Sequence, residues 1–198
     1  MKDVIAAEVA AAGPIPFERF MHLALYGETG FFSSSRLRSE KAGDFLTSPE
    51  VSPMFGETLA VFVRAERDRI GEPFRLVEVA GGSGSLLRTL LGMIEVETWA
   101  VEVSPAATAA LGYVVDPARV VSSLDSIDGP LRGVVVANEL LDNLPMAIAQ
   151  LTADGWRERW VGQGAEGLAF IDADPRPEVI SWLDRFAGPV EVGGWVEV

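Results

Sequence analysis

Apolar and polar positions follow their clearest pattern in the middle of the chain, over residues 71–145. Short apolar runs there predict four buried strands, at residues 74–79, 99–103, 120–122 and 133–137. Residues 85–94 have the spacing of an amphipathic helix, and Ser104 with Pro105 opens another. Because strands that alternate with helices form parallel sheets through right-handed crossovers, the predicted fold class is α/β and Rossmann-like.

The segments on either side have different patterns. Residues 1–70 predict amphipathic helices, interrupted by an irregular polar stretch at residues 28–43. Residues 146–152 and 156–161 flank the turn Asp154-Gly155 and predict a β-hairpin, followed by a helix at residues 177–186. We expect one domain over residues 1–198, in three parts: a helical N-terminal region (1–70), a Rossmann-like half (71–145) and a C-terminal hairpin and helix (146–198).

The edge of this predicted sheet needs a cover, because an exposed edge strand promotes aggregation. The hairpin or a homo-oligomer contact could supply it. The sequence could also be incomplete, since residues 193–198 have the pattern of a strand that is only beginning. The sequence does not decide between the hairpin, a homo-oligomer contact and an incomplete sequence.

The balance of charges and residue types excludes several classes of function. Lysine and arginine number 16, aspartate and glutamate number 29, and the net charge is −13. Because nucleic-acid binding needs clustered cations, this balance argues against it and suits a cationic ligand or substrate. The chain has no cysteine and a single histidine, His22, which excludes thiol catalysis, disulfides and multi-histidine metal sites. No apolar run is long enough to insert into a membrane, so we expect a cytoplasmic protein.

A glycine-rich turn, Ala80-Gly81-Gly82-Ser83-Gly84, joins the first predicted strand to the helix that follows. Glycine lets the backbone approach a ligand closely, and the amides that open the helix point towards that ligand. Glu78 precedes the turn. Glu102 ends the next strand roughly twenty residues later, where a carboxylate binds the ribose hydroxyls of an adenosine. The sequence therefore predicts an adenosine-cofactor site.

Other residues of the turn decide between adenosine cofactors. A dinucleotide fingerprint that starts at Gly82 would need glycine where Leu87 stands, and a P-loop would need lysine after Gly84. S-adenosylmethionine has no phosphates and carries positive charge, which suits the acidic residue Glu78. We therefore expect S-adenosylmethionine, and a dehydrogenase is the least favoured alternative. The residues expected to bind the cofactor are Glu78, Ala80, Gly81, Gly82, Gly84, Glu102 and Ser104.

Longer stretches of the chain resemble one known family. The most specific are Thr47-Ser48-Pro49-Glu50 and Asn138-Glu139-Leu140-Leu141-Asp142, and Val101-Glu102-Val103-Ser104-Pro105 supports them. Together they resemble the MidA-like family of S-adenosylmethionine-dependent methyltransferases, which includes a mitochondrial complex I assembly factor that methylates arginine. The resemblance covers residues 13–145 and implies a class I methyltransferase sheet. Members of the family are longer, which implies a fragment or a shortened member.

The resemblance also implies roles for residues beyond the glycine turn. The expected acceptor is a protein, and arginine by analogy. Glu139 and Asp142 follow the last predicted strand, where parallel-sheet proteins bind substrates, and Asn138 at the strand end is expected to contact the reacting centre or the cofactor. The segment expected to close over the cofactor pocket contributes Thr47 and Ser48, which are expected to bind the cofactor, and Glu50, which is expected to be catalytic along with Glu139, Asn138 and Asp142.

Alternative interpretations remain for these residues and for the whole chain. Glu50, Glu139 and Asp142 could simply be charges that stabilise helix N-termini. The family usually has glycine in place of Ala80, where a methyl group is accommodated if the backbone φ angle is negative. A non-catalytic cofactor-binding or assembly protein is therefore the second hypothesis, and a small-molecule methyltransferase is the third.

Overall fold

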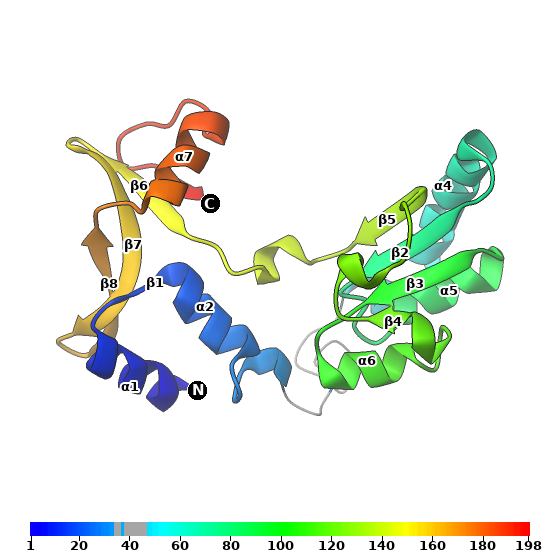
Figure 1. Ribbon diagram of the computed structural model, residues 1–198, viewed down its shortest axis with the longest axis horizontal. Helices are drawn as coiled ribbons and strands as arrows, with labels where there is room; N and C mark the ends of the chain where they lie inside the picture. Colours follow the sequence, from blue (N-terminus) through cyan, green and yellow to red (C-terminus); the bar gives the residue numbers. More distant parts are fainter. Residues whose placement is uncertain (34–36, 38–46) are drawn as a thin grey trace. The chain divides into compact units, whose positions relative to one another are not determined.

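The structure is a computed structural model, and it describes residues 1–33, 37 and 47–198 (Figure 1). The chain divides into two compact units, each described here by itself. Unit 1 combines Met1–Ser33 with Asn143–Val198, and unit 2 covers Ser34–Asp142. The single domain expected over residues 1–198 stays a prediction. Most of the predicted irregular stretch at 28–43 lies outside the described residues.

Unit 2 contains a four-stranded sheet in the order β4-β3-β2-β5, with every pair parallel. Its strands are β2 (Arg75–Val79), β3 (Glu97–Val101), β4 (Val120–Val121) and β5 (Gly133–Ala137). Their limits agree with the predicted strands to within about two residues, the usual precision of element boundaries. The predicted α/β class with a parallel, Rossmann-like sheet is confirmed.

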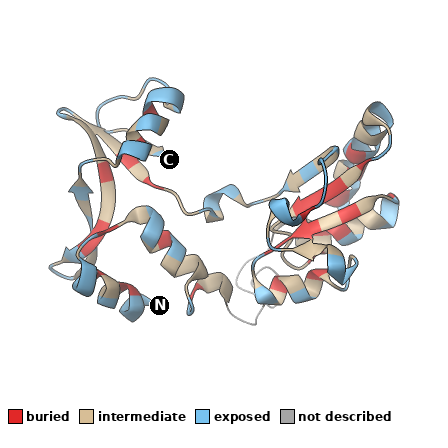
Figure 2. Cartoon of the chain, in the orientation of Figure 1, coloured by how far each residue is buried: buried red, intermediate tan, exposed pale blue. Residues whose placement is uncertain are grey.

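Helices cover one face of this sheet. The helices of unit 2 are α3 (Ser48–Val51), α4 (Met54–Ile70), α5 (Ser85–Met93) and α6 (Pro105–Leu111), with short 3₁₀ turns η2 (Pro117–Arg119), η3 (Leu124–Ser126) and η4 (Leu141–Asn143), the last of which crosses into unit 1. Val63 of α4 and Leu87 of α5 pack on Leu76 of β2 with no exposed surface, and buried residues run along β2 and β3 (Figure 2). Burial of this apolar face fixes the sheet that carries the glycine turn.

Unit 1 is built around an antiparallel sheet, in the order β1-β7-β6-β9 with β8 also paired to β7. Its elements are α1 (Lys2–Ala12), β1 (Ile15–Pro16), α2 (Phe17–Tyr26), η1 (Phe31–Ser33), β6 (Ile148–Thr152), β7 (Gly155–Gly164), β8 (Gly167–Ala173), α7 (Pro177–Phe186) and β9 (Trp195–Glu197). The predicted hairpin and the predicted helix at 177–186 are both present, whereas strand β8 was not predicted. No helix within the described ranges has both the length and the apolar character that a bilayer crossing requires.

The hairpin belongs to the sheet of unit 1. Its strands β6 and β7 pair with each other and with β1, β8 and β9, and residues 195–197 form β9, which pairs antiparallel with β6. In the sheet of unit 2, β5 pairs with β2. What covers the edge of the parallel sheet stays a prediction.

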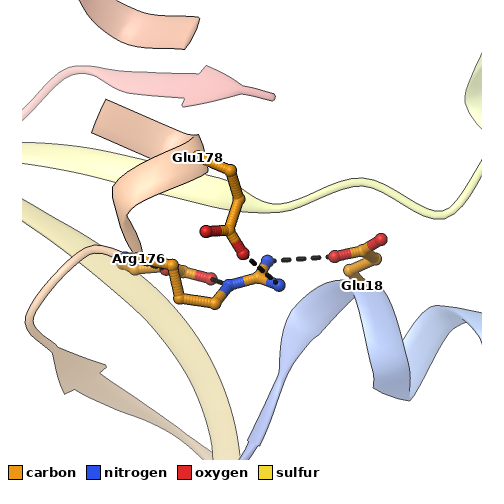
Figure 3. Close-up of polar contacts among 4 residues, drawn as sticks. Glu18, Arg176 and Glu178 are labelled. Atoms are coloured by element: carbon orange, nitrogen blue, oxygen red, sulfur yellow. Dashed lines mark hydrogen bonds and ion pairs between the residues drawn. The ribbon is translucent and has the colours of Figure 1, made fainter. Parts of the chain in front are cut away.

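A buried ion pair joins three elements of unit 1. The side chain of Glu158 on β7 is fully buried, and its Oε1 lies 2.9 Å from Nε of Arg176. Arg176 also contacts Glu18 of α2 at 3.0 Å and Glu178 of α7 at 3.3 Å (Figure 3). Because a buried carboxylate is costly without a cationic partner, this cluster fixes α2 and α7 against the sheet.

Candidate cofactor site

Residues that follow three neighbouring strands meet at one edge of the parallel sheet. Val79 of β2 is paired in register with Val101 of β3 and with Ala137 of β5. The next residues along the chain, Ala80, Glu102 and Asn138, therefore lie at the carboxyl ends of adjacent strands. In parallel sheets this edge is where ligands bind.

The glycine turn has a strained backbone at Ala80. Its φ angle is +58°, and its amide donates a hydrogen bond to the carbonyl of Val101 at 2.8 Å. The negative φ angle that would accommodate the methyl group of Ala80 is therefore not observed. At this residue the chain changes direction as it leaves β2, while the amide of Ala80 keeps its hydrogen bond to Val101. Of the other non-glycine residues described, Glu139 alone has a positive φ angle, +53°. Left-handed residues of this kind gather at functional sites.

Replacing Ala80 by glycine is expected to stabilise the protein by about 1 kcal/mol, because glycine adopts a left-handed φ angle without steric cost. The free energy of unfolding in urea measures the effect. Ala60, fully buried in a helix with ordinary backbone angles, provides the control, and Ala60→Gly should destabilise. If Ala80→Gly destabilised the protein as much as Ala60→Gly does, the backbone of Ala80 would not be strained.

Glu102 links the end of β3 to the glycine turn. Its Oε1 accepts hydrogen bonds from the amides of Val103 and Ser104, both at 2.8 Å, and its Oε2 accepts one from the amide of Gly82 at 3.3 Å. The side chain is largely buried. The carboxylate is thus held in place beside the turn, at the position expected to bind a ribose.

Glu78 is a buried carboxyl beneath the turn. Its side chain is 3% exposed, and Oε2 has no hydrogen-bond partner among the described residues. Burial, together with the negative charge of Glu102, raises the pKa of Glu78 from 4.5 to about 8. A β-carbon at Gly81 would lie 2.7 Å from Oε2, so a larger residue there would have to displace this carboxyl. A buried carboxyl of this kind, without a partner for Oε2 among the described residues, is suited to a cationic ligand, because the positive charge would hold the carboxyl ionised.

A cavity lies between the glycine turn and α3. Its lining comprises Thr47, Pro49, Glu50, Glu78, Ala80, Gly81, Gly82, Ser83, Ser85, Leu86 and Asn138. Among these described residues none is a lysine or an arginine, whereas two are glutamates. The charge of this lining therefore suits a cationic group without phosphate, of the kind that S-adenosylmethionine carries, and the cavity of about 40 Å³ has room for such a group and not for a whole cofactor.

The predicted residue Glu50 has partners on both sides. Its Oε2 accepts hydrogen bonds from the amide and hydroxyl of Thr47, at 2.9 and 3.1 Å, which completes a capping box at the start of α3. Its Oε1 accepts a hydrogen bond from the hydroxyl of Ser83 at 2.8 Å. The simpler interpretation, a helix N-terminal charge, is correct but incomplete, because Glu50 also contacts the glycine turn.

Several predicted residues lie outside the cavity lining. Glu139 and Asp142 are exposed beyond the end of β5, where a 3₁₀ helix, η4, and not an α-helix begins after Glu139 and includes Asp142. Their alternative interpretation as helix N-terminal charges stays open, because Asp142 lies in the first turn of this short helix. The other predicted residues outside the lining are Glu102, which is hydrogen-bonded to the amide of Gly82 in the turn, Ser48, which opens α3, Gly84, which caps α5, and Ser104, which caps α6 and donates its amide to Glu102.

Ser83 and Ser85 were not predicted as site residues, although both line the cavity. Their hydroxyl oxygens lie 2.8 Å apart, and that of Ser83 reaches Glu50. The Gly-Ser-Gly-Ser pattern of the turn is the only sequence signal for them. The glycines of this pattern were predicted to have a role, and the serines were not.

A comparison with protein families finds one match that covers most of the chain. The family model described as "Putative S-adenosyl-L-methionine-dependent methyltransferase" matches residues 54–197. This range includes the glycine turn, Glu102 and Asn138. It also includes the hairpin of unit 1.

Similar proteins point in the same direction. A crystal structure from Burkholderia thailandensis, bound to S-adenosyl-homocysteine, superposes with a TM-score of 0.77 at 30% identity, over 100% of this chain and 55% of that one. The mitochondrial protein arginine methyltransferase NDUFAF7 of Danio rerio is 29% identical over 86% of this chain and 46% of its own length. The Drosophila melanogaster homologue is 34% identical over 51% of this chain and 25% of its own length. The chain thus spans less than half the length of these two relatives.

Proposed function

The chain belongs to the family of S-adenosyl-L-methionine-dependent methyltransferases, as its resemblance to MidA-like proteins predicted, and we propose that it binds S-adenosylmethionine and transfers the methyl group to a protein. One observation carries the proposal: the register of β2, β3 and β5 brings the glycine turn, Glu102 and Asn138 to one sheet edge. There Glu102 is already hydrogen-bonded to the turn.

The residues of this edge suit the parts of the cofactor. Glu102 would accept the ribose hydroxyls, and the buried Oε2 of Glu78, which has no hydrogen-bond partner in the described part of the chain, would lie near the cationic amino-acid part. The amide of Gly82 would be released when Glu102 turns to the ribose. When bound, the cofactor supplies a methyl group activated by a sulfonium. The chain contributes position and negative charge.

The acceptor that this chain's chemistry fits is an arginine side chain. The Danio rerio relative is named a protein arginine methyltransferase, and the net charge of −13 attracts a cationic substrate. Glu139 and Asp142, exposed just beyond β5, would hold the guanidinium. One of these carboxylates would take the proton that the nitrogen loses as its bond to the methyl group forms.

Replacing Glu139 by alanine is expected to lower methyl transfer about 100-fold, because an aligned carboxylate is lost, and to leave cofactor affinity within about twofold. Transfer of tritiated methyl from S-adenosylmethionine to proteins of the source cell measures the rate. Glu57→Ala, an exposed glutamate on α4, provides the control. Equal labelling by wild type and the Glu139 variant would contradict the assignment.

A second function, cofactor binding without turnover, is favoured by the strained Ala80 in the turn. It predicts saturable binding of S-adenosylmethionine with no methyl group transferred to protein arginine. Label on a small molecule and not on protein would instead support a small-molecule methyltransferase. The same labelling experiment therefore distinguishes the three functions.

A further inference from the structure

The Glu50 carboxylate connects two segments that lie 33 residues apart in the sequence. One of its oxygens, Oε2, closes the capping box with Thr47, and the other, Oε1, accepts the hydroxyl of Ser83 at 2.8 Å. The Ser83 hydroxyl is in turn 2.8 Å from that of Ser85 at the start of α5. A single carboxylate therefore holds α3 and the glycine turn together.

The turn needs such a restraint because of the residues around Ser83. Gly82 and Gly84 on either side have φ angles of +55° and +76°, which only glycine adopts without cost. Glycine also has the largest backbone freedom to lose on ordering. Residues 81, 82 and 84 are glycines, so Ser83 has the only side chain in residues 81–84 that can form a hydrogen bond. It alone can therefore anchor this stretch through its side chain.

α3 needs the same bond for its own position. The helix has four residues, Ser48–Val51, and a helix of one turn is not stable alone in water. Its capping box fixes the local shape but not its place beside the turn. The hydrogen bond from Ser83 supplies that, and because its acceptor is charged it is stronger than a neutral one.

We propose that Glu50 is a positioning residue, which acts through Ser83 to hold the glycine turn and α3 as one cofactor-binding unit. The inference rests on the proposed cofactor site. Both segments line the same cavity, so a shift of either changes its shape. Glu50 thereby sets cofactor affinity through its bond to Ser83, without taking part in methyl transfer.

Removal of either partner should weaken binding of S-adenosyl-homocysteine by the same amount. Ser83→Ala and Glu50→Ala are each expected to raise its dissociation constant roughly tenfold, the effect of one hydrogen bond to a charged group. The double variant should be no weaker than the single ones, because both substitutions remove the same bond. Ser83→Thr, which keeps the hydroxyl, should restore most of the affinity.

Isothermal titration calorimetry of the full chain, with thermal unfolding alongside, tests this inference. Ser83→Ala leaves the capping box intact, so its loss of affinity should come without a large change in melting temperature even if Glu50→Ala folds poorly. Ser123→Ala, which removes the hydroxyl that caps η3, is the matched control and should bind normally.

Two results would overturn the inference. Wild-type affinity in Ser83→Ala would show that the bond to Glu50 does not position the turn. Additive losses in the double variant would show that the two residues act independently. Either result, obtained with a wild-type chain that binds, leaves the proposed function standing, whereas a wild-type chain that fails to bind would refute the proposed function itself.

Discussion

Replacing Glu102 by alanine is expected to weaken binding of S-adenosylmethionine at least about 100-fold, roughly 3 kcal/mol. The carboxylate would accept two ribose hydroxyls in a largely buried position, and hydrogen bonds to a charged group contribute about 1.5–3 kcal/mol each. Isothermal titration calorimetry of the full chain measures the change in affinity.

Two further variants separate recognition of the ribose from damage to the fold. Glu102→Gln keeps an oxygen for the amides of Val103 and Ser104 but loses the charge, so a loss of about tenfold is expected. Glu95→Ala, an exposed glutamate just before β3, should bind normally. If all three variants bind like wild type, Glu102 does not contact the cofactor.

Replacing Glu78 by glutamine is expected to stabilise the ligand-free protein above neutral pH. The pKa of Glu78 is raised to about 8 in the folded chain, against 4.5 for an exposed carboxyl. Between these values the folded state binds a proton that the unfolded state lacks, so the wild-type free energy of unfolding falls as the pH rises. Each pKa unit is worth about 1.4 kcal/mol, so the variant should gain roughly 4 kcal/mol over wild type by pH 8.5.

Urea unfolding of wild type and Glu78→Gln at pH 5.5 and pH 8.5 measures this gain. Because every other titrating group is common to both proteins, the difference between their free energies of unfolding isolates Glu78. The two proteins should be closest at pH 5.5 and should diverge at pH 8.5. A difference that does not change with pH would show that Glu78 ionises normally.

The parallel sheet was predictable because its strands are short and apolar. β5 is a continuous run of small and β-branched residues, and α7 begins at a proline, so both were placed at their observed limits. Strand β8 was missed because its pattern is not clean: Phe170 and Asp172 are both among its more exposed residues, so no apolar face stands out. Its position depends on pairing with β7.

The site residues that lie at strand ends were predictable from the sequence. Those that are brought to the site by tertiary contacts were not. Glu102 and Asn138 follow β3 and β5, the strands on either side of β2, and the sequence predicts strand ends at both residues. The bond between Glu50 and Ser83 joins distant segments, so no local pattern reports it. The positive φ angle of Ala80 is contrary to the preference of alanine, so only the structure shows the strain.

The most direct test of the cofactor site is a calorimetric titration of the intact 198-residue chain with S-adenosylmethionine, with NAD as the competing adenosine cofactor. We predict saturable binding of one S-adenosylmethionine per chain and no heat from NAD. Absence of saturable S-adenosylmethionine binding by a folded chain, or equal binding of NAD, would contradict the account.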